Sequence, residues 1–484
     1  MSIFDTGTPQ FLAESIGKIQ FHEFQKVICN SIISAVSKGN GRIIISVPPG
    51  HGKSELASKW LPLWLLNNNP ARRIITASYN QQNADKWGRV LRNIINERQD
   101  ILNVKIAPDS KAKRFWHTTA GGSMLCAGVG GTLTGNHANI INIDDPFKNW
   151  EDAMSRSRRE AVIDWYLTSL STRILPNATI ILIQTRWHEN DLAGFLLKSG
   201  EKWTNLRFPA ISEGDGDLLN RPLGELLVPG LFPAQYFAEQ KKHLGSMRFA
   251  ALYQQTPQAE TGNIFLREYW QRYLPAAKPK KFERVIHSWD TAFETKKSSS
   301  YTVCTTWGQF EKRYYLLGIW REKADYPTVK RKMFELWQSE KTSVILLEDK
   351  ASGKPLRQEL RQAGLPIIEV EPCTDKLTRA WPVVPIFEDK RVFIAAGEEW
   401  ADAVIAGFAS YPAGDWADAV DTVSQALTFL NGTGGALGAN NLNDILVGRK
   451  QKTFRFGKSL NSFTIRQRPH WYRNNVNARR YYCE

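Results

Sequence analysis

The sequence predicts an α/β protein with two domains, and its length and hydrophobic pattern support this prediction. With 484 residues, the chain is too long for one ordinary hydrophobic core. Two of its stretches alternate short apolar segments with helical patterns, and they are separated around residues 210–280. Short, β-branched segments that are apolar on both faces are typical of buried strands in a parallel sheet.

The first stretch predicts a domain over residues 1–210 that contains a mainly parallel sheet. Its strand-like segments are Arg42–Val47, Arg73–Ser78, Ile140–Ile143 and Thr179–Gln184, and Gln81–Glu97 has a helical pattern. A connecting segment is expected over residues 211–280, because it includes the polar link QQTPQAETGN.

The second stretch predicts another α/β domain over residues 281–430. Its expected strands are Arg284–Trp289, Tyr301–Gln309, Arg313–Trp320 and Ser343–Leu347, and its expected helices are Pro327–Ser339 and Pro355–Ala363. Beyond this domain, NGTGGALGANN predicts a flexible hinge into a basic, aromatic tail over residues 431–484.

Composition and charge favour a cytoplasmic protein that binds a polyanion. No apolar run approaches the roughly 20 residues of a membrane helix, and the N-terminal MSIFDTGTPQ lacks the order of a signal peptide. The five cysteines never form CxxC, which argues against a disulfide framework and a zinc site. The net charge of +15 favours nucleic acid as partner, with an acidic membrane second.

The segment PPGHGKS lies between the strand-like RIIISV and the helical ELASKWLPLWLL, which predicts a phosphate-binding loop. In such a loop, backbone N–H groups hold phosphates, a lysine reaches the β- and γ-oxygens, and a hydroxyl binds Mg²⁺. The standard spacing requires glycine where this chain has Val47, and a turn with an incidental GKS is the alternative. The predicted nucleotide-binding residues are Gly50, His51, Gly52, Lys53, Ser54 and Glu55, with Lys53 also catalytic and Ser54 also a metal ligand.

The run Ile140–Asp145 is an apolar strand that ends in two carboxylates. This arrangement predicts that Asp144 binds the Mg²⁺ of a nucleotide and that Asp145 polarises the attacking water. The alternative is that both acids only cap the turn before Pro146. Together with the phosphate-binding loop, the pair predicts ATP hydrolysis.

Further residues of the first domain are predicted to act on the nucleotide. Gln25 is a candidate for binding the adenine edge, and Gln184 and Thr185 are candidates for sensing the γ-phosphate at the end of a strand. An exposed helical glutamine is the alternative for Gln25. The candidates for an arginine finger are Arg114, Arg158 and Arg186. A metal site at His188, Glu189 and Asp191 is not favoured, because no second histidine stands at ligand spacing.

Carboxylates follow three separate elements of the second domain. Asp290 ends the strand in HSWDTAF, Glu348 and Asp349 end the strand in SVILLEDKASG, and DWADAVD opens a helix with Asp415, Asp418 and Asp421. If these elements converge, their acids can hold two Mg²⁺ or Mn²⁺ ions roughly 4 Å apart for phosphodiester hydrolysis. Solvated strand ends and helix caps are the alternative. Lys376 and Arg379 are candidates for steering a DNA phosphate, with a solvated basic pair as the alternative.

These motifs resemble the large terminase subunit of tailed double-stranded DNA bacteriophages. The resemblance is carried by SVPPGHGKSEL, GVGGTLTGNHANIINIDDP, IQTRWHENDLAG, FAALYQQTP and the acidic motifs, and it spans roughly Gln25 to Leu427 in the family's order. It implies a P-loop ATPase that drives DNA into a procapsid, followed by an RNase H-like nuclease that cuts concatemeric DNA.

The resemblance also implies site residues for the nuclease. Asp290 and Asp418 match the first and third acids of the family, and Glu348 matches the second, with Asp349 as its competitor. Many relatives carry two consecutive aspartates where this chain has Ala417 and Asp418, so the contribution of Asp421 as a metal ligand stays open.

The implied cofactors and partners are those of a packaging motor. ATP with Mg²⁺ serves the motor, and two Mg²⁺ or Mn²⁺ ions serve the nuclease. The partners are double-stranded DNA, the portal of the procapsid, the small terminase subunit and further copies of the chain in a ring, with a monomer in solution as the alternative. The implied location is the host cytoplasm, with transient docking on the procapsid.

Competing functions are a helicase or repair nuclease, which normally needs a second motor domain, and a nucleotide-binding assembly scaffold. Three roles compete for the tail: DNA binding, docking on the portal or another packaging component, and a disordered extension.

Overall fold

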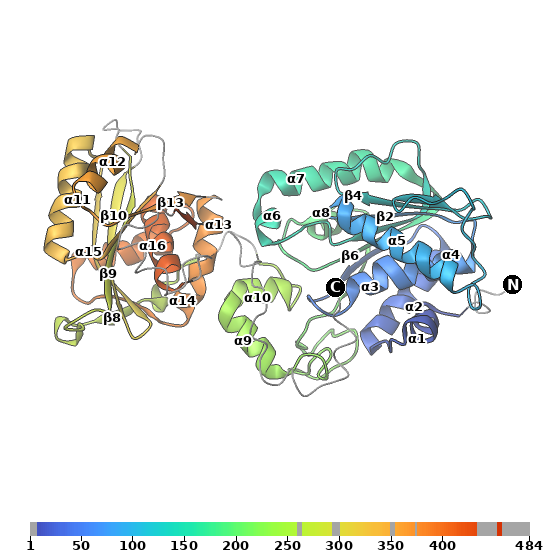
Figure 1. Ribbon diagram of the computed structural model, residues 1–484. Coiled ribbons are helices and arrows are strands. Elements are labelled where there is room, and N and C mark those ends of the chain that lie inside the picture. The colour runs from blue at the N-terminus through green and yellow to red at the C-terminus, as the bar shows by residue number, and fades with distance from the viewer. Residues whose placement is uncertain are drawn as a thin grey trace. The chain divides into compact units, whose positions relative to one another are not determined.

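The computed structural model describes residues 7–258, 264–292, 301–348, 354–372, 375–432 and 453–456. The chain forms two compact units (Figure 1), one of Met1–Lys241 with Ser246–Ala259 and the other of Lys242–Gly245 with Glu260–Glu484. Each unit is built on its own β-sheet, as expected for two α/β domains. Among the helices within the described ranges, none is both long and apolar enough to cross a membrane.

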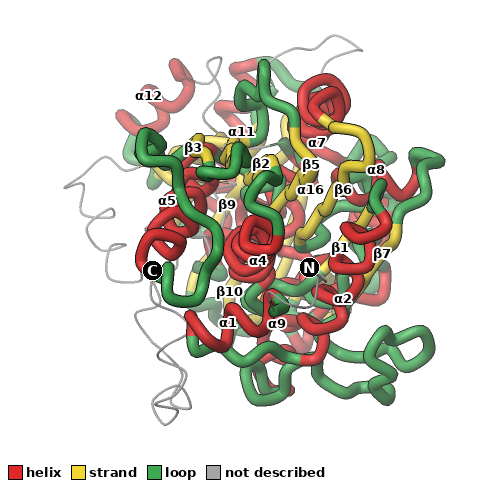
Figure 2. The backbone as a smooth tube through the Cα atoms, turned by 90° about the vertical axis from the view of Figure 1, so that its right-hand side faces the viewer, coloured by secondary structure: helices red, strands yellow, loops and turns green. Residues whose placement is uncertain are grey.

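Within the described residues, the first unit contains a seven-stranded sheet in the order β3-β4-β2-β5-β6-β1-β7. Neighbouring strands are parallel except β3 and β4, and Figure 2 shows β2, β5, β6, β1 and β7 in this order. The strands are β1 (Arg42–Ser46), β2 (Arg73–Ser78), β3 (Phe115–His117), β4 (Ser123–Gly128), β5 (Ala138–Asp144), β6 (Ile174–Gln184) and β7 (Thr204–Arg207).

Helices cover both faces of this sheet, because alternate side chains of a strand point to opposite faces. Ile43 and Ile45 belong to a core shared with α1, α2, α4 and α5, whereas Ile44 belongs to a core shared with α7 and α8. The helices before residue 253 are α1 (Pro9–Gly17), α2 (Glu23–Lys38), α3 (Lys53–Glu55), α4 (Leu61–Asn68), α5 (Gln81–Glu97), α6 (Trp150–Met154), α7 (Arg156–Trp165), α8 (Leu192–Lys198), α9 (Ala234–Leu244) and α10 (Ser246–Leu252).

The expected connecting segment, residues 211–280, is divided between the two units instead of standing apart. The Gln254 side chain donates to the carbonyl of Ile211 and accepts from its N–H, which ties the early and late parts of residues 211–258 together. Further along the chain, β8 (Gln271–Tyr273) pairs with β14 (Val392–Ala395) in the sheet of the second unit. The polar composition predicts a linker, whereas these contacts tie the described parts of the segment to one unit or the other.

In the described part of the second unit, eight strands form a mixed sheet in the order β15-β13-β12-β9-β10-β11-β14-β8. Strands β9, β10 and β11 are antiparallel neighbours, and the other pairs are parallel. The strands besides β8 and β14 are β9 (Arg284–Asp290), β10 (Thr302–Phe310), β11 (Arg313–Glu322), β12 (Val344–Glu348), β13 (Ile367–Pro372) and β15 (Thr453–Phe456). Strand β15 belongs to the predicted tail, whose residues 433–452 and 457–484 lie outside the described ranges.

Helices flank this sheet as well. Helices α11 and α12 share a buried core with Trp289 and Leu347, whereas the backbone of α16 accepts a hydrogen bond from Ser288 on the other face. Figure 1 shows α11 and α12 on one side of the sheet and α16 on the other. The helices are α11 (Tyr326–Glu340), α12 (Lys354–Gln362), α13 (Lys376–Ala380), α14 (Val384–Glu388), α15 (Glu399–Ala409) and α16 (Ala417–Leu430).

We predict that Gly88→Ala destabilises the first unit, although alanine is the better helix former. On an open helix surface this change stabilises by roughly 1 kcal/mol. In α5, however, a Cβ at Gly88 would lie 2.2 Å from the carbonyl oxygen of Lys113 and 2.7 Å from the Cys126 sulfur. Overpacking of this kind costs about 1–3 kcal/mol, so thermal unfolding should occur several degrees lower. The exposed Asn93→Ala on the same helix is the control, and a rise in melting temperature for Gly88→Ala would contradict the prediction.

Candidate nucleotide site and candidate nuclease site

The loop between β1 and α3 has the backbone that its glycines allow. Gly50 and Gly52 have φ angles of 78° and 75°, in the left-handed region that favours glycine. Val47, which replaces the expected glycine, is fully buried, and its N–H donates to the carbonyl of Gln184 at 3.1 Å. Since Val47 continues β1 and is not among the positive-φ residues of the chain, its position does not need glycine.

Asp144 ends β5 and points toward the helix that follows the loop. Its two carboxylate oxygens accept hydrogen bonds from Ser54 Oγ at 3.0 Å and from Ser58 Oγ at 2.8 Å. Burial raises the pKa of Asp144 to about 7, and the adjacent Asp145 carboxylate adds to this shift. The predicted ligands Ser54 and Asp144 are thus in direct contact. Ser58 was not among the predicted residues, although its spacing of four residues from Ser54 places both hydroxyls on one helix face.

Asp145 links three segments of the first unit. One of its carboxylate oxygens lies 2.9 Å from Lys53 Nζ, and the other accepts from the N–H of Thr185 at 2.9 Å. Its φ angle of 45° lies in the left-handed region and is uncommon for a residue with a side chain. The structure therefore brings together Lys53, Asp145 and Thr185, which lie after three different strands.

The other predicted nucleotide-binding residues lie around the loop with different surroundings. Gln25 is buried, its amide oxygen accepts from His22 N–H, and its amide nitrogen lies 3.3 Å from where a Cβ at Gly52 would be. Gln184 is fully buried at the end of β6, and neither of its amide atoms has a hydrogen-bond partner among the described residues. Glu55 instead pairs with Lys59 along its own helix at 3.1 Å.

His51 is enclosed by aromatic rings. Its ring centroid lies 4.7 Å from that of Phe232 and 6.3 Å from that of Phe24, and its Nδ1 lies 2.9 Å from the carbonyl of Pro49. Burial lowers the pKa of His51 to about 4, so the ring is neutral at pH 7. These contacts give His51 an anchoring role for the loop.

The three arginine-finger candidates all have partners within the first unit. Arg186 forms a buried ion pair with Asp191 at 2.9 Å, Arg158 pairs with Asp152 at 2.8 Å, and Arg114 donates to the carbonyl of Thr132 at 3.2 Å. Asp191 also caps α8 by accepting from the N–H of Gly194. The ion pair and the helix cap thus account for the buried carboxylate of Asp191 near His188 without a metal.

In the second unit, three acids from distant segments meet. Asp290 ends β9, Glu348 ends the neighbouring β12, and Asp421 projects from α16, with ligand oxygens that all lie within 4.8 Å of one another. Because Trp289 and Leu347 face the α11 and α12 core, the next side chains face α16. The predicted convergence of the acid segments is therefore present in the structure. Asp349 lies outside the described residues.

Asp418 lies beside this cluster, and Asp421 takes the place in it that the resemblance gives to Asp418. Lys376 Nζ lies 2.5 Å from Asp418 and 3.5 Å from Asp290. Arg379 contacts Asp421, and its guanidinium lies 3.7 Å from Glu348. Both predicted basic residues thus bind the acids, and neither is a solvated surface charge.

The residues of the cluster fit a divalent cation. Asp290, Glu348 and Asp421 are 2%, 6% and 4% exposed. Together with Asp418 they make four carboxylates, and among the described residues two cations, Lys376 and Arg379, contact them. Burial raises the pKa of Asp421 to about 6, with Arg379 opposing and Asp290 adding to the shift. Asp421 Oδ1 has no hydrogen-bond partner within the described ranges. Buried carboxylate oxygens that lie this close together are suited to bind a hard metal ion.

The two sites combine nucleotide chemistry with phosphodiester chemistry in one chain, which defines a class of ATP-driven motors that carry their own nuclease. The family models agree with this class. Residues 44–272 match the N-terminal domain of the terminase large subunit, T4likevirus-type, and residues 287–428 match the terminase RNaseH-like domain. The chain belongs to the terminase large subunit family.

Membership in this family confirms the predicted fold class and function. The protein is an ATPase and nuclease of viral DNA packaging, with an RNase H-like domain after the P-loop domain. The second motor domain that a helicase normally needs is not present among the described residues, and a scaffold without enzymatic activity does not agree with the family.

Solved structures of phage and viral terminases resemble the chain at low identity. The large terminase of a thermophilic bacteriophage, solved with ADP, is 12% identical, with 85% of this chain and 100% of that chain covered and a TM-score of 0.48. The large terminase of bacteriophage HK97 is 14% identical, with 78% of this chain and 86% of that chain covered and a TM-score of 0.38. The terminase nuclease domain of human cytomegalovirus is 12% identical, with coverages of 34% and 92% and a TM-score of 0.26. Curated protein sequences gave no match.

We predict that Ser58→Ala raises the Mg²⁺ concentration needed for half-maximal ATPase activity by roughly 10- to 100-fold, the usual effect of losing a partner that orients a metal ligand. The change removes the hydrogen bond to one Asp144 oxygen and leaves that buried oxygen without this donor. ATPase rates over a Mg²⁺ titration measure the effect. Ser31→Ala, which removes a hydroxyl that donates to the backbone of α2, is the control. Equal Mg²⁺ requirements in the two variants would argue against this role.

Proposed function

We propose that the two sites divide the work of packaging between the residues named above. Lys53, Ser54, Asp144 and Asp145 hydrolyse ATP, and Asp290, Glu348 and Asp421 form the metal-binding core of the nuclease. The observation that carries the nuclease assignment is the buried cluster of three carboxylates from distant segments, whose oxygens lie within 4.8 Å of one another.

In the nucleotide site, Lys53 and Asp145 exchange partners. The ammonium of Lys53 lies 2.9 Å from Asp145 Oδ2, and a nucleotide phosphate attracts the same ammonium. When Lys53 turns to the phosphate, Asp145 Oδ2 becomes available to accept a proton from water, while the Thr185 N–H holds Oδ1 in place. Ser54 and Asp144 hold Mg²⁺, and the buried amide of Gln184 at the end of β6 senses the γ-phosphate.

In the nuclease site, Asp290, Glu348 and Asp421 hold the divalent ions. Bound Mg²⁺ or Mn²⁺, in a pair, activates the water and stabilises the leaving oxygen of a DNA phosphodiester. Arg379 fixes the orientation of Glu348 and Asp421 through its contacts with both, and Asp418 acts through Lys376. The third ligand is therefore Asp421, with Asp418 in a supporting position.

The partners follow from the family and from the charge. The chain acts on double-stranded DNA, and a small terminase subunit is its partner. In the host cytoplasm, a ring of copies docks on the portal of a procapsid. The net charge of +15 supports a polyanionic substrate.

We expect Asp421→Asn to reduce metal-dependent DNA cleavage more strongly than Asp418→Asn. Loss of a direct ligand removes charge at the reacting phosphate, which costs at least about 100-fold, whereas loss of a supporting partner costs roughly 10- to 100-fold. Cleavage of plasmid DNA at a fixed Mn²⁺ concentration measures both. A larger loss in Asp418→Asn would assign the third ligand to Asp418.

We expect Lys53→Ala to abolish ATPase activity while metal-dependent cleavage of plasmid DNA persists. Asp290→Asn should give the reverse result, because each change removes a group from one site only. Loss of both activities in either variant would contradict the proposed division of work, provided that circular dichroism shows a folded chain.

A further inference from the structure

Helix α13 places two cations among the nuclease acids, three residues apart. Asp375 caps this helix by accepting from the N–H and the hydroxyl of Thr378. Lys376 lies against Asp290 and Asp418, while Arg379 lies against Glu348 and Asp421. One short helix therefore supplies positive charge to all four acids.

The two cations differ in burial. The Arg379 side chain is 5% exposed, whereas the Lys376 side chain is 36% exposed. Arginine offers a rigid, planar set of donors, and lysine is a compact charge on a flexible stem. Arg379 is thus suited to remain in the cluster, and Lys376 is suited to leave its carboxylates for another anion.

We propose that Lys376 competes with the divalent metal for Asp290 and, once displaced, binds a phosphate of the DNA strand, so that metal and DNA strengthen each other's binding. This inference rests on the proposed metal role of Asp290, Glu348 and Asp421. Without metal, the ammonium offsets carboxylates that would otherwise repel DNA. With metal bound, that offset is supplied by the ion, and the ammonium becomes a phosphate ligand at the mouth of the site.

The proposal defines a coupling that can be measured without turnover. Mn²⁺ affinity is measured by calorimetry on the full chain without nucleotide or DNA, and the heat that Asp290→Asn abolishes identifies the nuclease site. The affinity for a short duplex is measured by fluorescence anisotropy in EDTA and in Ca²⁺, with intact duplex confirmed after each titration. In the wild type, metal should tighten duplex binding within the roughly 5- to 150-fold range of linked sites.

Lys376→Ala should bind Mn²⁺ several-fold more tightly than the wild type in the absence of DNA, and its coupling factor should fall toward one. Lys330→Ala is the matched control, because Lys330 also pairs with an acid, Glu359, but on the surface. Lys376→Gln, which keeps most of the side-chain volume, replaces Lys376→Ala if that variant does not fold. Unchanged or weaker Mn²⁺ binding, or an unchanged coupling factor, overturns the inference. Absence of a wild-type heat that depends on Asp290 instead overturns the proposed metal site.

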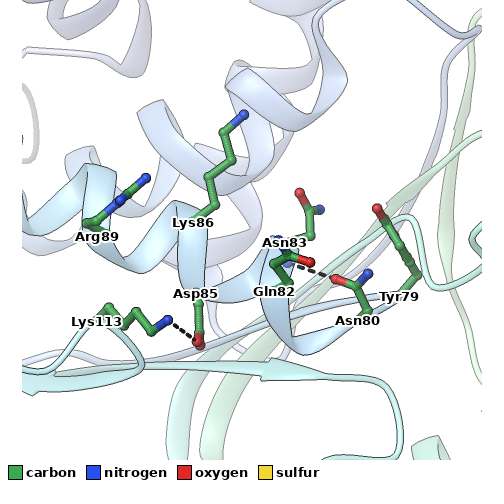
Figure 3. A pocket seen from close by; sticks show the side chains of 8 residues that line it. All are labelled: Tyr79, Asn80, Gln82, Asn83, Asp85, Lys86, Arg89 and Lys113. Carbon is green, nitrogen blue, oxygen red and sulfur yellow. Dashed lines mark hydrogen bonds and ion pairs between the residues drawn. The ribbon is translucent and has the colours of Figure 1, made fainter. Parts of the chain in front are cut away.

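A separate hollow of about 510 Å³ lies in the first unit at the end of β2 and the start of α5. All the residues that line it are polar, and they include the acid Asp85 and the basic Lys86, Arg89 and Lys113. In Figure 3, Lys113 and Asp85 point toward one another, and a hydrogen bond joins the backbone of Asn83 to the Asn80 side chain. Among these lining residues, three basic side chains thus stand against one carboxylate, which Lys113 already contacts at 3.3 Å.

The position of this hollow links it to the nucleotide site. Strand β2 lies beside β5 with Ser78 opposite Asp144, so both features lie at the carboxyl edge of the same sheet. Ligands of open α/β sheets bind at this edge. We infer that the hollow binds phosphates of the DNA backbone through Lys86, Arg89 and Lys113, one strand away from the nucleotide.

The double variant Lys86→Ala/Arg89→Ala tests this second inference. A plot of log affinity for duplex DNA against log salt concentration should become less steep, its slope smaller in magnitude by about 1 to 2. DNA stimulation of the ATPase should decrease, while basal ATPase activity stays unchanged. Lys38→Ala/Lys202→Ala removes the same charge from exposed positions of the first unit and is the control. An equal slope and equal stimulation in both double variants overturn the inference, whereas a wild type without DNA-stimulated ATPase overturns the motor assignment itself.

Discussion

Both sites depend on negative charge that the fold buries at the ends of strands. Burying carboxylates is costly unless nearby groups compensate for the lost hydration. In the first unit, Asp144 is compensated by the hydroxyls of Ser54 and Ser58. In the second, Arg379 and Lys376 contact the acid cluster, in which Asp421 Oδ1 has no hydrogen-bond partner among the described residues. A divalent cation can bind these clustered oxygens, so the same feature that costs stability provides affinity for metal.

The direction of these carboxylates is fixed by the alternation of side chains along a strand, and this part was predictable from sequence. Trp289 and Leu347 are apolar and enter the α11 and α12 core, so the next residues must face the opposite side. The sequence therefore predicted the acids at strand ends and the strands themselves, with Arg73–Ser78 found as β2 and Gln81–Glu97 found as α5. Such features are predictable because the periodicity of a strand or helix, and a loop that needs glycine, are each encoded by a few adjacent residues.

What the sequence could not predict depends on contacts between distant segments. Asp418 and Asp421 share one helical face, and periodicity alone cannot tell which of them enters the cluster. Tertiary packing decides this, since Asp421 is 4% exposed against Arg379 whereas Asp418 faces Lys376. Similarly, the division of residues 211–280 between the units depends on pairing of β8 with β14, which no local pattern indicates.

On the proposed assignments, the two units use one electrostatic device in different surroundings. Lys53 is held by Asp145, and Lys376 is held by Asp418 and Asp290; in each case the lysine neighbours a metal ligand and is the group that a phosphate attracts. The metal ligand Asp144 is bonded by the hydroxyls of Ser54 and Ser58, so these hydrogen bonds can persist while Lys53 moves. In the nuclease, Lys376 also touches the metal ligand Asp290, so phosphate and metal act on the same ammonium. A nucleotide can therefore draw Lys53 away from Asp145 while Asp144 keeps its hydroxyl partners, whereas in the nuclease metal and DNA strengthen each other's binding.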